Sequence, residues 1–221
     1  MKFAVAIDGP AGAGKSSVAK AAAKELGFIY VDTGALYRTV GLYMLKNNIA
    51  QDDLSAVKNA LQKITVDMEH HEDGQHVFLN GEDVTDQIRT PAVTKAASDF
   101  SKIPAVRNFL FSTQTSMAER YDVLMDGRDI GTVVLPHAQV KVFLTASPEE
   151  RARRRYLELE QKGAPVPYET LLADIRARDE QDSSRETAPL KPAEDGVILD
   201  TSDLDFEASV QALLKIVRER M

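Results

Sequence analysis

Runs of apolar residues along the chain follow two different periods, and the first two runs predict a buried strand followed by a helix. The segment Phe3 to Ile7 is continuously apolar, which is typical of a strand that is covered on both faces. After a glycine-rich stretch, Val18, Ala22 and Leu26 recur every four residues, so a helix is expected from about Lys15.

The same order of strand and helix repeats further along the chain. Residues 28–31 predict a second short strand, and apolar stripes predict helices after Asp32 and from about Asp53. A βαβα order implies a parallel sheet with right-handed crossovers. Later strands are expected at 123–125, 140–144 and 197–199. The sequence thus predicts an α/β protein, a three-layer sandwich around a five-stranded parallel sheet.

Residues 65–86 break this rhythm. Apolar and polar residues alternate here, as Val66 and Val77 illustrate, and the pairs Asp73-Gly74 and Asn80-Gly81 are typical of hairpin turns. We therefore expect a small antiparallel insert in the parallel fold.

The remaining segments read as helices. Proline stands at an expected first helical position after Thr90, at Pro104 and after Ser147, where Ser-Pro-Glu-Glu forms a capping box. The last of these helices is expected to end near Gly163. Two further helices are predicted at 168–182 and 206–218.

Composition limits the classes of function. A chain of 221 residues, 43% hydrophobic and 28% charged, is long enough for one buried core with a small insertion. A net charge of −7 argues against binding to nucleic acid or to an anionic membrane. The lack of cysteine excludes disulfides, and the first apolar run is too short for a membrane span, so a cytoplasmic protein is expected.

The junction of the first strand and helix carries the clearest motif, a complete G-x-x-x-x-G-K-[ST] pattern. In such a loop the backbone N–H groups bind phosphate oxygens, Lys15 reaches the terminal phosphates, and Ser16 ligates Mg²⁺. The alternative is a glycine-rich turn that only connects strand to helix. The residues expected to bind ATP are Gly9, Pro10, Ala11, Gly12, Ala13, Gly14, Lys15, Ser16 and Ser17.

Two further polar clusters come directly after predicted strands, and ligands gather at the carboxyl ends of strands in such sheets. The segment 32–38 places Asp32 and Arg38 near the second strand, where an arginine suits a second phosphate; the alternative is a helix N-cap and a solvated arginine. The segment 126–129 joins Asp126, which can hold magnesium through water, to Arg128. Its alternative is a charged turn with a surface ion pair.

Two helices carry arginines whose role the pattern leaves open. Arg178, Asp182 and Arg185 share one face of a late helix, which by spacing alone favours a salt-bridged stripe. The run 151–155 fits an exposed face, because Glu149 and Glu150 precede Arg153 and Arg154 by four residues. It equally fits a mobile lid that brings cations to a transferring phosphate.

With these motifs in view, the sequence resembles bacterial-type cytidylate kinases, a family of P-loop nucleoside monophosphate kinases. No Asn-Lys-x-Asp motif of a GTPase is found in the chain. The stretches that carry the resemblance are residues 7–16, 32–38, 86–90 with Ser98, and 125–134.

The resemblance implies one kinase domain over residues 1–221, with a monophosphate-binding region at about 37–120, the insert at about 65–86, and a lid at about 148–185. It implies a catalytic group made up of Lys15, Arg128, Arg151, Arg154 and Arg155. It implies CMP-binding residues Thr33, Arg38, Ser98, Arg107, Arg128, Asp129, Arg178, Asp182 and Arg185. Magnesium would be held by Ser16 and, through water, by Asp126.

The expected reaction is transfer of the γ-phosphoryl group of ATP to CMP or dCMP, by a monomer with Mg²⁺ as cofactor and with no nucleic-acid or membrane partner. Two alternatives remain at this stage. One is a P-loop kinase for AMP, shikimate or a sugar acid. The other is a regulatory or scaffold protein that binds ATP without transferring phosphate.

Overall fold

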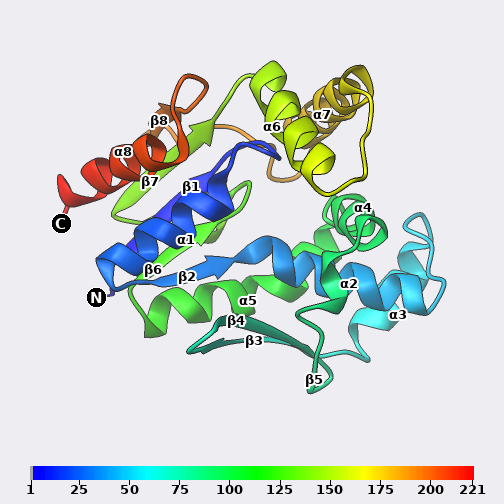
Figure 1. The fold of residues 1–221 in the computed structure, drawn as a ribbon. Coiled ribbons are helices and arrows are strands. Elements are labelled where there is room, and N and C mark those ends of the chain that lie inside the picture. The colour runs from blue at the N-terminus through cyan, green and yellow to red at the C-terminus, as the bar shows by residue number, and fades with distance from the viewer. Residues whose placement is uncertain (1) are drawn as a thin grey trace. The chain divides into compact units, whose positions relative to one another are not determined.

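The computed structural model describes residues 2–221, and these divide into two compact units. The insert unit is Ile29–Asp122, together with Lys2. The P-loop unit combines Phe3–Phe28 with Val123–Met221. Figure 1 shows the order of the elements along the chain.

The main sheet is parallel and has five strands, in the order β2-β6-β1-β7-β8. In the P-loop unit β1 pairs with both β6 and β7, and β7 pairs with β8. All five residues of β1 are buried: four belong to the predicted apolar run, and the fifth is Asp8, which follows that run. The strands are β1 (Ala4–Asp8), β2 (Ile29–Asp32), β6 (Val123–Asp126), β7 (Val140–Thr145) and β8 (Val197–Asp200). The expected α/β fold with a five-stranded parallel sheet is confirmed.

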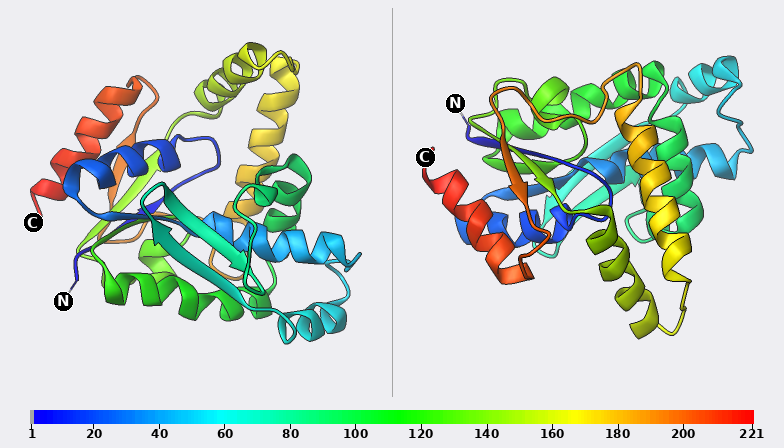
Figure 2. Two further views of the ribbon diagram at one scale, coloured as in Figure 1. Left: turned by 60° about the horizontal axis from the view of Figure 1, so that its bottom comes forward. Right: turned by 90° about the horizontal axis from the view of Figure 1, so that it is seen from above.

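The helices of the P-loop unit form two groups. Helices α1 and α8 pack against each other beside the sheet, while α6 and α7 form a helical hairpin, as Figure 2 shows. The hairpin has its own apolar contacts, with Leu171 and Leu172 buried against Ala152. The helices are α1 (Lys15–Leu26), α6 (Pro148–Gln161), α7 (Tyr168–Ser183) and α8 (Phe206–Arg218).

The insert unit joins helices to the predicted antiparallel sheet, which is confirmed. Its three strands lie in the order β3-β4-β5. Helix α2 packs mainly on α4. The elements are α2 (Thr33–Lys46), α3 (Leu54–Leu61), β3 (Val66–His71), β4 (Gly74–Leu79), β5 (Glu82–Asp83), the 3-10 helix η1 (Gln87–Arg89), α4 (Pro91–Phe100) and α5 (Pro104–Arg120).

One hairpin turn differs from the prediction by one residue. Gly74 pairs with His71 in the ladder, so the turn is formed by residues 72–73 and not by Asp73-Gly74. The second turn, Asn80-Gly81, lies where the sequence placed it, with positive φ at both residues. Positive φ at both central residues is what the favoured two-residue hairpin turn requires.

The capping signals were reliable guides to where helices begin. The side chain of Ser147 accepts a hydrogen bond from the N–H of Glu150, and Thr90 does the same for Val93. The sequence did not predict η2 (Ile130–Val134), a π-helical turn directly after β6. Within residues 2–221 the structure contains no helix that is both long and apolar enough to span a membrane.

Candidate active site

The phosphate-binding loop leaves the buried strand β1 and enters α1, as the motif requires. Gly14 precedes the helix in the left-handed conformation, with φ 83°. At Gly9, φ is 150°, and a Cβ atom there would lie 2.0 Å from the carbonyl oxygen of Leu144. Only glycine permits this conformation and this close approach. The loop is therefore held against β7 at its first residue.

Lys15 is buried at the start of α1. Its Nζ donates a hydrogen bond to the carbonyl oxygen of Pro10 at 2.7 Å, which curls the side chain back over the loop. Burial and the nearby charge of Arg128 lower the pKa of Lys15 from 10.5 to about 7. A buried ammonium that faces the loop interior is well placed to bind an anionic phosphate.

Ser16 and Asp126 bring the loop and the end of β6 together. The hydroxyl of Ser16 donates to Oδ2 of Asp126 at 3.0 Å, and Asp126 is buried. A hydroxyl and a carboxylate at this distance are oxygen donors of the kind that Mg²⁺ prefers. These two residues fit the expected metal site.

Asp8, the last residue of β1, connects this region to the π-helical turn. Its carboxylate accepts hydrogen bonds from the N–H groups of Ile130, at 2.7 Å, and of Gly131, at 2.8 Å. Burial raises the pKa of Asp8 from 3.8 to about 6, although the two N–H groups oppose the rise. The turn thus keeps a fixed place directly after the segment that carries Arg128 and Asp129.

Arg128 lies in a cluster with Asp182, near the end of α7, and Arg185, just after that helix. Its Nε donates to Oδ2 of Asp182 at 2.9 Å, and Nη2 of Arg185 lies 3.6 Å from the other oxygen of the same carboxylate. The side chain of Asp182 is 6% exposed. The Asp182 carboxylate therefore holds two of the arginines that were expected to bind the acceptor phosphate.

Arg151 is the most buried arginine of α6. Its side chain is 2% exposed and forms an ion pair with Asp179 of α7. It also donates to the carbonyl oxygens of Ala11, at 3.0 Å, and of Ala146, at 2.9 Å. Arg151 therefore joins the phosphate-binding loop to both helices of the hairpin.

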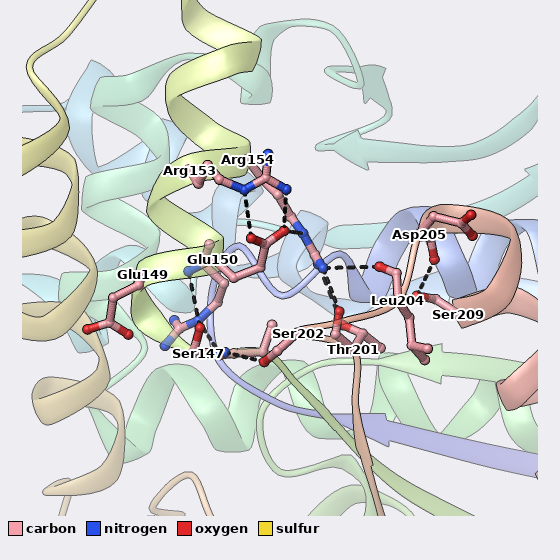
Figure 3. Close-up of polar contacts among 12 residues, drawn as sticks. Ser147, Glu149, Glu150, Arg153, Arg154, Thr201, Ser202, Leu204, Asp205 and Ser209 are labelled. Carbon is pink, nitrogen blue, oxygen red and sulfur yellow. Dashed lines mark hydrogen bonds and ion pairs between the residues drawn. The ribbon is translucent and has the colours of Figure 1, made fainter.

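Arg154 contacts the segment after β8, as Figure 3 shows. Its Nε donates to Glu150, and its Nη2 donates to the carbonyl oxygen of Thr201 at 2.6 Å. A Cβ atom at Gly14 would lie 3.9 Å from Nη1 of Arg154. This arginine is thus near the start of α1.

The two outer arginines of α6 make local pairs. Arg155 pairs with Glu158, and Arg153 pairs with Glu150 three residues earlier. The Glu149 carboxylate, which the spacing suggested for Arg153, instead pairs with Arg176 of α7. The exposed-face description therefore suits Arg153 and Arg155, whereas Arg151 and Arg154 make long-range contacts.

In the insert unit, Asp32 and Arg38 form an ion pair of 2.6 Å between Oδ2 and Nη2. The other carboxylate oxygen of Asp32 accepts a hydrogen bond from the N–H of Ala35, so Asp32 is also the N-cap of α2. The N-cap that the sequence offered as the alternative for Asp32 is therefore confirmed, and the same carboxylate also pairs with Arg38. Arg38 is directed toward Asp32 and is not a freely solvated side chain.

The three other residues expected in the insert unit lie on three different helices. Thr33 is buried at the start of α2, and Ser98 lies in α4. Arg107 of α5 is buried, donates to the carbonyl oxygen of Ser101 at 3.3 Å, and stacks over the ring of Tyr37, with its guanidinium carbon 5.8 Å from the ring centroid. A buried arginine with donors on a planar group can hydrogen-bond to a nucleobase.

The profile of the cytidylate kinase family matches residues 5–219. Curated relatives that bear the name cytidylate kinase match nearly the whole chain. The one from Caldicellulosiruptor bescii is 50% identical over 97% of this chain and 95% of its own length. The one from Geobacillus sp. strain WCH70 is 49% identical over 98% of this chain and 97% of its own length. The chain belongs to the cytidylate kinase family.

Comparison of structures agrees at the level of the fold. A solved structure of an uncharacterized protein from Eubacterium ventriosum has a TM-score of 0.54 and covers 100% of both chains, at 13% sequence identity. At 13% identity the likeness shows only that the two proteins share a fold.

Sequence reasoning missed three residues that support the site in this family member. Asp8 was passed over although it is an acidic residue at the end of a buried strand, which is a usable signal. Asp179 lies in α7, four residues after Ile175, among many other charged residues. Gln75 lies in the hairpin strand β4. Nothing local distinguishes these two from solvated residues.

Proposed function

We propose that this protein transfers the γ-phosphoryl group of ATP to CMP, and to dCMP, to give ADP and the nucleoside diphosphate. The observation that carries the proposal is the buried Lys15 in a complete phosphate-binding loop, with Ser16 hydrogen-bonded to Asp126. Full-length similarity to proteins named cytidylate kinase supports CMP as the acceptor.

The donor nucleotide would bind along the loop of residues 9–17. Backbone N–H groups at the start of α1 and the ammonium of Lys15 would hold the phosphates. Ser16 and Asp126 would hold Mg²⁺, Asp126 through water. When bound, this ion would neutralise charge on the phosphates.

The acceptor would be recognised by polar and charged residues of each unit. In the insert unit, Arg38 would hold the acceptor phosphate, and Thr33, Ser98 and Arg107 would contact the cytosine. In the P-loop unit, the Asp182 carboxylate orients Arg128 and Arg185 for the same phosphate. Asp129 would contact the base, and Arg178 with Asp182 the ribose.

The chemistry needs little from a general base. An acceptor phosphate is already anionic near neutral pH, so its oxygen can attack the γ-phosphorus in line while ADP leaves from the opposite side. Positioning and charge neutralisation then supply most of the rate acceleration. Arg151, Arg154 and Arg155 of α6 would add positive charge to a lid that excludes water. The transfer is direct, so no covalent intermediate with the protein forms.

Three further features belong to the same proposal. The protein acts as a monomer, it works in the cytoplasm, and its recognition of cytosine rejects UMP. A pocket that hydrogen-bonds the base discriminates strongly, because a mismatched base leaves buried polar groups without partners.

A coupled assay of ADP release tests the proposal, with ATP and a panel of CMP, dCMP, UMP, AMP and shikimate. We expect release with CMP and dCMP, little with UMP, and none with AMP or shikimate. Faster release with AMP or shikimate would overturn the acceptor assignment. Binding of ATP without release for any acceptor would instead favour a regulatory nucleotide-binding protein.

A further inference from the structure

Gln75 of the antiparallel insert makes two hydrogen bonds to a single residue. Its Oε1 accepts from the backbone N–H of Asp32 at 2.7 Å, and its Nε2 donates to the carbonyl oxygen of Asp32 at 3.1 Å. A primary amide that satisfies both backbone groups of one residue imitates the pairing of a neighbouring strand. Gln75 is therefore bound to the last residue of β2.

Asp32 in turn holds the first turns of α2. One carboxylate oxygen caps α2 through the N–H of Ala35 at 3.1 Å, and the other pairs with Nη2 of Arg38 at 2.6 Å. The position of the Asp32 backbone thus determines where the guanidinium of Arg38 lies. Hydrogen bonds therefore connect β4 of the insert to this arginine through a single residue, Asp32.

The packing around the pair leaves little room for adjustment. A Cβ atom at Gly34 would lie 3.0 Å from Oδ1 of Asp32 and 3.1 Å from Nη1 of Arg38. Both distances are shorter than ordinary van der Waals contacts between such atoms, so a side chain at position 34 would displace the carboxylate or the guanidinium by a few tenths of an ångström. Because Asp32 pairs directly with Arg38, a shift of Asp32 would also move its ion-pair partner.

We propose that Gln75 is a positioning residue for the acceptor phosphate, which it serves by holding Asp32 and, through it, Arg38. The insert then has a role in catalysis although Gln75 touches no reacting atom. The inference rests on the proposed function, in which Arg38 binds the phosphate of CMP.

The test compares Gln75→Met with Gln139→Met as a matched control. Gln139 also uses its side-chain oxygen to accept from a backbone N–H, that of Ala4 at 2.8 Å, but it has no connection to Arg38. We expect Gln75→Met to raise the KM for CMP about five- to tenfold, as loss of a half-buried pair of hydrogen bonds would. The KM for ATP should stay within about twofold in both variants, and Gln139→Met should leave both constants unchanged.

A double-mutant cycle with Arg38→Ala separates the inference from the function on which it rests. If Gln75 acts through Arg38, adding Gln75→Met to Arg38→Ala has no further effect on the KM for CMP. An undiminished effect of Gln75→Met in that background overturns the inference, as does equal damage to the KM for ATP and CMP. If Arg38→Ala itself leaves the KM for CMP unchanged, the assignment of Arg38 fails instead.

Gln75→Asn serves as a second variant should the methionine lower expression. It retains the amide but is one methylene shorter, so it cannot span both backbone groups of Asp32. The same selective rise in the KM for CMP is expected. A loss of thermal stability with unchanged KM for CMP would show a purely structural role and contradict the inference.

Discussion

Arg128 and Asp182 are joined by a hydrogen bond of 2.9 Å between Nε and Oδ2, which links the end of β6 to α7. The Asp182 side chain is almost fully buried, so its charge has few partners other than arginine. An arginine that must bind a phosphate oxygen gains orientation from a carboxylate on its far side. The pair therefore connects Arg128, the arginine that we propose binds the acceptor phosphate, to the helical hairpin.

Asp182→Asn is expected to lower kcat/KM for CMP by about 10- to 100-fold, since it removes the charge that hydrogen-bonds to Arg128 and forms an ion pair with Arg185. Steady-state kinetics with CMP measures the change. Asp195→Asn is the control, because it breaks an ion pair with Lys141 in the same unit. An equal loss in both variants would contradict a specific role for Asp182.

Lys15→Ala should reduce turnover by at least about 100-fold while the protein stays folded, since one preorganised charge at the transferring phosphate is lost. The measurement pairs the ADP-release rate with circular dichroism of the same sample. Near-normal turnover in a folded variant would refute the role of Lys15. Arg128→Ala is expected to behave in the same way.

The buried Asp8 makes stability depend on pH. Its pKa is raised to about 6 in the folded protein from an ordinary 3.8, so the unfolded chain releases its proton first as pH rises. Stability contributed by this group is therefore full below pH 3.8 and is lost as pH rises through about 6. The difference between these two pKa values corresponds to about 3 kcal/mol in the free energy of unfolding.

Asp8→Asn removes this titration. We expect the free energy of unfolding of the unmodified protein, taken relative to Asp8→Asn, to fall between pH 4 and pH 7, as measured by urea unfolding at each pH. A constant difference across this range would show that Asp8 is ionised throughout. Asn keeps only one of the two acceptor oxygens, so loss of one N–H bond to η2 should also reduce the rate, because Arg128 and Asp129 directly precede that turn.

His76 lies between two carboxylates on the antiparallel insert, with Nδ1 2.6 Å from Asp83 and Nε2 3.0 Å from Asp73. Hydrogen bonds to both raise the pKa of His76 above 6.5. The stabilisation that this charge provides is present below 6.5 and is lost as pH rises through the folded pKa. NMR titration should show a lower pKa for His76 in Asp83→Asn, and an unchanged value would contradict the pairing.

Features set by short stretches of sequence could be predicted. The strand β1, the phosphate-binding loop and α1 follow from an apolar run, glycines and a four-residue stripe, all within residues 3–26. The N-cap at Ser147 likewise fixed the start of α6, although the N–H of Ser147 donates to Ser202 and not to Glu150, so the predicted capping box is only half formed. The sequence placed the first hairpin turn at Asp73-Gly74, one residue too late. The Asp-Gly pair is typical of a turn, but Gly74 already pairs with His71 in the ladder.

Features set by distant parts of the chain could not be predicted. Asp8 binds N–H groups more than 120 residues away, and Gln75 binds a residue 43 positions earlier. The arginine run shows the same limit, since Arg151 is buried against Asp179 while Arg153 is exposed beside Glu150. Periodicity gives the face of a helix but not the partner that covers it.

The most direct test of the proposed function follows the phosphoryl group itself. The protein is incubated with ATP labelled in the γ-phosphate, Mg²⁺ and CMP, and the products are separated by chromatography, with Lys15→Ala as the control. The account predicts label in CDP, equal in amount to the ADP formed, and none with the variant. Label found only in inorganic phosphate, or absent from CDP while ADP accumulates, would contradict it.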